Sequence, residues 1–135
     1  MSRERLLKLF LILAGTVCLA VYPLVVLWPS GWDWGQEGRH YLHMILVVYA
    51  VLGGFLILAA RDPAAHRSLL LFTAWSSAAH GALMAGQSLL LEGQHWHLTG
   101  DVPAMWFLAL GLAVLMPRRE PAGLAGRDPV YLAGS

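Results

Sequence analysis

The chain has 135 residues, enough for one compact unit and too few for two ordinary domains. Its hydrophobic fraction is 58% and its charged fraction 13%, whereas soluble domains average about 45–50% apolar and about 25% charged residues. The net charge is only +1, whereas nucleic-acid-binding proteins carry an excess of basic residues, so we expect no nucleic-acid partner. The single cysteine, Cys18, excludes an intrachain disulfide. This composition favours a protein whose exterior contacts the lipid bilayer.

Four apolar segments approach the length of a membrane-spanning helix, which needs roughly 20 residues to cross about 30 Å of hydrocarbon. They are residues 6–28, 41–60, 68–91 and 102–116. The fourth is short, and it crosses only if Arg118 and Arg119 reach back to the membrane surface or the bilayer thins locally; otherwise it is re-entrant. We predict an all-α fold, a membrane four-helix bundle in residues 1–117, followed by a flexible tail in residues 118–135.

Basic residues indicate the orientation, because short cytoplasmic loops retain Lys and Arg. Eight of the nine basic residues lie on one side of the membrane, before the first segment, between the second and third, and after the fourth (Arg3, Arg5, Lys8, Arg61, Arg67, Arg118, Arg119, Arg127). Only Arg39 lies on the opposite side, in the loop between the first and second segments. Tryptophans prefer the headgroup level, and all but Trp75 lie in or beside the two external loops (Trp28, Trp32, Trp34, Trp96, Trp106). Both patterns predict cytoplasmic termini, in a bacterial inner membrane.

Small residues spaced four apart allow helices to approach closely in lipid. The third segment has two such rows, Ser77-Gly81-Ala85 and Ala78-Ala82-Gly86; the second offers Ala50 and Gly54, and the fourth offers Ala109 and Ala113. Contacts within one bundle explain these faces. The alternative is an interface with a second copy or with another membrane protein.

A stripe of polar residues follows one face of the third segment. At about 100° per residue, this face collects Thr73, Ser76, Ser77, His80, Met84 and Gln87. It should turn inward, because an unpaired polar group in hydrocarbon costs several kcal/mol. His80, near mid-membrane, is either a neutral imidazole bonded to a neighbouring helix or part of a functional site. With Met84 and with Cys18, which lies at nearly the same depth, it would suit Cu(I) or a partial haem pocket.

Two pairs of histidines face the external side. His40 and His43 stand three residues apart at the start of the second segment and share a helix face, while His95 and His97 form an H-x-H pair in the second external loop. Together they could bind zinc or copper. The alternative is that all four are interfacial or solvated side chains without a ligand.

Four stretches together resemble a known family. They are WPSGW (28–32), LAARDPAAHRSL (58–69), WSSAAHG (75–81) and GDVPA (100–104). The chain is similar over residues 6–119 to a family of small, uncharacterised bacterial four-helix membrane proteins. The resemblance implies the architecture and carries no activity.

Catalytic motifs such as H-E-x-x-H, G-x-S-x-G and phosphate-binding glycine loops are missing from the sequence. The predicted spans also lack the carboxylate that small multidrug exporters require. We therefore favour a non-enzymatic accessory or interaction subunit, or one that binds a small apolar ligand, with no cofactor required. The alternatives are a histidine-based metal or haem redox protein, using copper, zinc or haem, and a small proton-coupled carrier.

Overall fold

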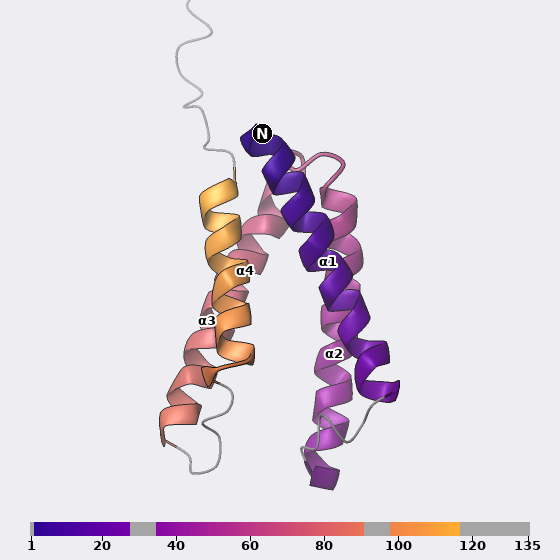
Figure 1. Ribbon diagram of the computed structural model, residues 1–135, viewed down its shortest axis with the longest axis vertical. Helices are drawn as coiled ribbons and strands as arrows, with labels where there is room; N and C mark the ends of the chain where they lie inside the picture. The colour runs from indigo at the N-terminus through magenta and orange to yellow at the C-terminus, as the bar shows by residue number, and fades with distance from the viewer. Residues whose placement is uncertain (1, 28–34, 91–97, 117–135) are drawn as a thin grey trace, which may run out of the picture.

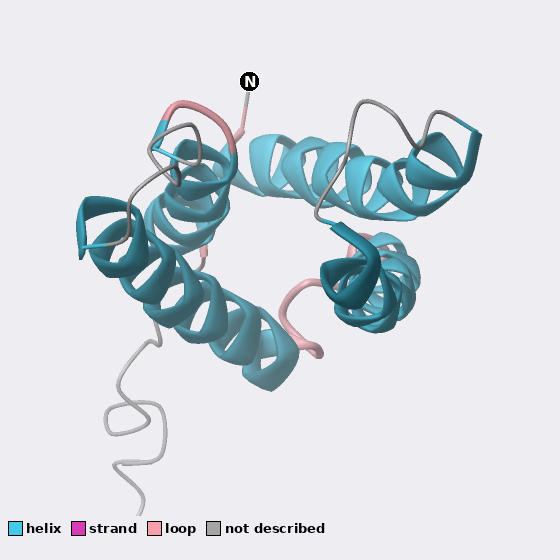
Figure 2. Ribbon diagram, turned by 90° about the horizontal axis from the view of Figure 1, so that it is seen from below, coloured by secondary structure: helices cyan, strands magenta, loops and turns pink. Residues whose placement is uncertain are grey.

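The computed structural model describes residues 2–27, 35–90 and 98–116. This part of the chain forms four helices: α1 (Arg3–Leu27), α2 (Gly35–Ala59), α3 (Arg67–Leu90) and α4 (Asp101–Leu115). It contains no strand, as Figure 2 shows. The predicted all-α, four-helix architecture is confirmed. The predicted tail lies outside the described residues.

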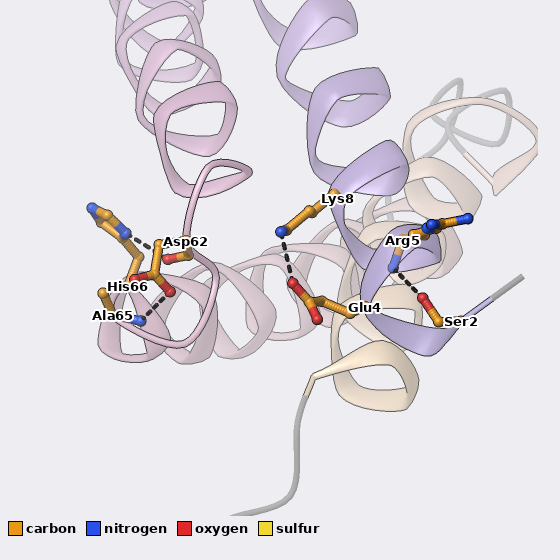
Figure 3. Close-up of polar contacts among 7 residues, drawn as sticks. All are labelled: Ser2, Glu4, Arg5, Lys8, Asp62, Ala65 and His66. Carbon is orange, nitrogen blue, oxygen red and sulfur yellow. Dashed lines mark hydrogen bonds and ion pairs between the residues drawn. The ribbon is translucent and has the colours of Figure 1, made fainter.

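Two helices begin several residues before the apolar segments from which they were predicted. α1 begins at Arg3 rather than near Leu6, and α2 begins at Gly35 rather than near Tyr41. In the first turns of α1, Lys8 forms an ion pair with Glu4 at 2.6 Å (Figure 3). Hydropathy marks the part of a helix that suits lipid, whereas polar turns can continue the same helix into the headgroup region.

Local hydrogen bonds define the first helix end and the turn between α2 and α3. The Ser2 hydroxyl accepts a 3.4 Å hydrogen bond from the Arg5 backbone N–H, as an N-cap does. In the turn, Asp62 Oδ1 accepts from the Ala65 backbone N–H at 3.2 Å, and the Asp62 carbonyl lies 2.9 Å from His66 Nδ1 (Figure 3). These bonds satisfy backbone groups that the helices leave free, so the chain reverses within a few residues.

The four helices are arranged as two antiparallel hairpins. α1 packs along α2, α3 packs along α4, and a smaller contact between α1 and α4 joins the pairs. The hairpins converge at the end that holds the start of α1 and diverge toward the other end (Figure 1). The main core lies where they converge and consists of large aliphatic side chains from all four helices, including Leu7, Leu11, Leu56, Leu70, Leu108 and Leu112.

Glycines set the close approach of helices within each hairpin. A Cβ on Gly53 of α2 would lie 2.6 Å from the Gly15 carbonyl oxygen of α1, so both positions require glycine. In the other hairpin, a Cβ on Gly81 would lie 3.0 Å from the Trp106 ring. The predicted role of Gly81 in helix packing is therefore confirmed.

Two other glycines of the predicted rows have a different environment. A Cβ on Gly54 or on Gly86 would meet nothing within 4 Å. The close contact on α2 is made by Gly53 and not by the predicted Gly54. Adjacent helical residues point about 100° apart, so when Gly53 faces α1, Gly54 faces away from it. Gly54 and Gly86 thus lie on faces that the four helices leave uncovered.

Many large apolar side chains are exposed on all four helices. Exposed fractions reach 60% for Leu13, 67% for Phe72 and 84% for Leu90. α1, α2 from His40 onward and α3 are each long and apolar enough to cross a membrane, whereas α4 is a shorter apolar helix of 15 residues, about 22 Å long. An apolar surface of this extent suits lipid and would be unfavourable in water.

Candidate ligand cavity between the hairpins

A cavity of about 310 Å³ lies between the two hairpins and is lined by all four helices. Its volume falls at the small end of the range for ligand sites, which are mostly apolar with a few convergent polar groups. The walls follow that description. Aliphatic side chains make up half of them (Val17, Val21, Leu42, Ile45, Leu46, Ala104), and the rest are polar or contain sulfur (Cys18, Tyr49, His80, Met84, Asp101, Met105).

Tyr49 links the hairpins across this cavity. Its hydroxyl donates to Met105 Sδ of α4 at 3.4 Å, and its ring meets the His80 ring of α3 edge to face, with centroids 6.2 Å apart. Thioether sulfur is a weak acceptor, so the Tyr49 hydroxyl could exchange this bond for one to a ligand oxygen or nitrogen without great loss. Tyr49 of α2 thus contacts both helices of the other hairpin, α3 and α4.

The structure brings together three residues that the sequence placed at one depth. Cys18 of α1 and His80 and Met84 of α3 line the same cavity, and all three are half-buried. His80 lies roughly 20 Å along α3 from Arg67, at about 1.5 Å per residue. The inward orientation predicted for the centre of the polar stripe is therefore found at His80 and Met84.

The other members of the stripe do not line the cavity. Ser76 donates to the Thr73 carbonyl of its own helix at 3.2 Å, Ser77 is buried, and Gln87 is exposed. Thr73 likewise donates to the Leu69 carbonyl at 2.9 Å. Short hydroxyl side chains can bond to carbonyls of the preceding turn, so they need no partner on another helix. Of the polar stripe, only His80 and Met84 therefore belong to the candidate site.

Asp101 and Tyr49 line the cavity but are not among the predicted site residues. Asp101 directly precedes the fourth predicted segment and is the first residue of α4; it is partly buried and lines the cavity. A carboxylate in the first turn is favoured by the positive end of the helix dipole. An acidic residue directly before an apolar helical run was the available signal.

The predicted external metal site is only partly within the described residues. His40 is exposed, whereas His43 is half-buried and meets the Tyr22 ring edge to face, with centroids 6.1 Å apart. His95 and His97 lie outside the described residues, so their convergence with the first pair stays a prediction. In the described ranges, no three His, Cys, Asp or Glu side chains are grouped closely enough to hold a metal ion.

Trp106 lies near the start of α4, five residues after Asp101. Its ring packs on Gly81 in the middle part of α3. The tryptophans at positions 28, 32, 34 and 96 lie outside the described residues. That the Trp106 ring also lies at the headgroup level stays a prediction.

Together these features define a small α-helical protein with helices of membrane-spanning length and a polar-centred cavity between two hairpins. The chain belongs to a family of unknown function, DUF6632, whose profile matches residues 1–128. This confirms the predicted membership of an uncharacterised four-helix family. No curated protein matches the chain, and no solved structure does.

Proposed function

We propose that this chain is an integral membrane protein of the bacterial inner membrane whose cavity binds a small, mainly apolar ligand. The observation that carries the proposal is the convergence of Cys18, Tyr49, His80 and Asp101 on one apolar cavity lined by all four helices. Such a protein would act as an accessory or ligand-binding subunit and would carry out no chemistry itself.

The membrane setting is supported by the exterior and by the distribution of charge. Large apolar side chains are exposed on every helix, as with Leu13, Val48, Phe72 and Phe107. The described basic residues other than Arg39 lie at the end where the hairpins converge. Short cytoplasmic segments retain Lys and Arg, so this end should face the cytoplasm.

Reporter fusions test this topology. Green fluorescent protein fused after Ser135 should fluoresce, and alkaline phosphatase fused there should be inactive, because the carboxyl end lies in the cytoplasm. Phosphatase inserted after Trp96, in the predicted second external loop, should be active. An active phosphatase at the carboxyl end would contradict the proposed arrangement.

The cavity walls indicate the chemistry of the ligand. Aliphatic side chains would contact an apolar body, while the Tyr49 hydroxyl and the His80 imidazole can each donate or accept one hydrogen bond. The Asp101 carboxylate would favour a donor or a positive group on the ligand. A small aromatic or aliphatic molecule with one or two polar atoms fits this arrangement.

A photoreactive aromatic probe tests whether the cavity accepts such a molecule. Purified protein in mild detergent would be illuminated with 1-azidoanthracene, and the labelled positions would be mapped by mass spectrometry. We expect saturable labelling of peptides that contain Cys18, Tyr49 or Met84. Ala104→Trp should reduce this labelling about tenfold or more, because the indole would occupy part of the cavity.

Ala79→Trp is the matched control, since Ala79 is exposed on α3 and does not line the cavity. Its labelling should equal that of the wild type. Circular dichroism and gel filtration would show whether each variant folds. If Ala104→Trp does not fold, Ala104→Leu fills the cavity with a smaller side chain. Equal labelling in the folded Ala104 variants would overturn the binding proposal.

A further inference from the structure

A second, larger hollow lies apart from the cavity described above. It has a volume of about 850 Å³ and runs along α3 and α4, with the first turn of α1 at one end. Arg3 and Arg67 line it at that end, where α1 and α3 begin and α4 finishes (Figure 1). We call this hollow the arginine groove.

Arg3 is held at the groove by the end of α4. Its guanidinium donates to the Met116 carbonyl at 3.1 Å and to the Val114 carbonyl. These are carbonyls of the last helical turn, which have no partner within the helix. A guanidinium carries five N–H donors, so these two contacts leave Arg3 able to bond further acceptors. The contact fixes a positive charge beside the groove.

The surroundings of the two arginines are also positive. In the described residues, the end where the hairpins converge carries five basic side chains and two acidic ones (Arg3, Arg5, Lys8, Arg61, Arg67; Glu4, Asp62). Glu4 pairs with Lys8, which lies on the same helix. A phosphate group placed between Arg3 and Arg67 would therefore enter a favourable potential.

Away from the arginines the groove is apolar. Its walls contain Leu71, Trp75 and Leu110, and small alanines of both helices leave the channel open between them. Trp75 is 75% exposed and lies about 12 Å along α3 from Arg67, at about 1.5 Å per residue. The groove thus has a charged mouth followed by an apolar channel.

We infer that the arginine groove binds one anionic phospholipid, with the phosphate at Arg3 and Arg67 and an acyl chain along α3 and α4 past Trp75. Basic pockets between membrane helices commonly recognise acidic headgroups in this way. Charge decides the occupant, because the excess of basic side chains at this end attracts an anionic headgroup and offers no such attraction to an apolar partner helix. This site is separate from the proposed ligand cavity and does not depend on it.

Native mass spectrometry of the purified protein tests this inference. The protein in detergent would be mixed with dioleoylphosphatidylglycerol or with dioleoylphosphatidylcholine at equal concentration. We expect one bound phosphatidylglycerol and at least tenfold weaker retention of phosphatidylcholine. Arg67→Gln should lower phosphatidylglycerol retention about tenfold, and the matched variant Arg5→Gln should lower it less than about twofold. Arg5 carries the same charge near the same end but does not line the groove.

A second variant tests the apolar part of the site. Ala113 lines the groove and is exposed, so Ala113→Trp should fill the channel and reduce phosphatidylglycerol binding while both arginines remain. Binding that is unaffected by both Arg67→Gln and Ala113→Trp would overturn the inference. Equal loss in Arg5→Gln, or a lipid-independent dimer that Ala113→Trp dissociates, would do so as well.

Discussion

Gly53→Ala should destabilise the protein by about 1–3 kcal/mol, because the added methyl group has no space between α1 and α2. Its Cβ would lie 2.6 Å from the Gly15 carbonyl oxygen and 2.9 Å from Cys18 Cβ. The nearest obstacle is backbone, so no side-chain rotation relieves it and the two helices must separate. In lipid this contact matters more than in water, since helix association depends on packing and not on water exclusion.

The neighbouring glycine provides the control. A Cβ on Gly54 would meet nothing within 4 Å, so Gly54→Ala should be neutral or stabilising by up to about 1 kcal/mol, because alanine favours the helix. Both variants would be unfolded by increasing sodium dodecyl sulfate in mixed micelles, with helicity followed by circular dichroism. Equal midpoints for Gly53→Ala and Gly54→Ala would show that the helices do not pack through Gly53.

Leu11→Ala should have a comparable effect through the core that joins the hairpins. Leu11 is fully buried in the cluster that includes Leu7, Leu56 and Leu112. Truncation would leave a cavity there, and buried Leu→Ala changes cost about 2–5 kcal/mol in soluble proteins. We expect about 2 kcal/mol here, because part of the soluble cost is transfer from water, which is absent in lipid.

Leu13→Ala is the matched control on the same helix. Leu13 is 60% exposed and should contact lipid in both the native and the separated state, so its truncation should cost less than about 0.5 kcal/mol. The same detergent titration compares the two variants. A cost for Leu13→Ala as large as that for Leu11→Ala would mean that this face of α1 is covered, for example by a second copy of the chain.

The candidate site was predicted in part. Depth along each helix follows from counting residues, so the sequence could bring Cys18, His80 and Met84 to one level. Tyr49 and Asp101 also line the cavity, and counting residues does not give the direction in which a side chain faces. Tyr49 is directed toward α3 and α4, where it contacts His80 and Met105, and Asp101 is the first residue of α4, one position before the predicted segment.

The amino-acid sequence alone determined that the chain forms four apolar helices, because each long uncharged run is helical wherever lipid excludes water from the backbone. The tertiary structure decided which face of each helix is covered. Leu11 and Leu13, or Gly53 and Gly54, are identical in type and differ only in what they contact. Lipid and a protein core are equally apolar, so hydropathy cannot distinguish the two faces, and only packing assigns them.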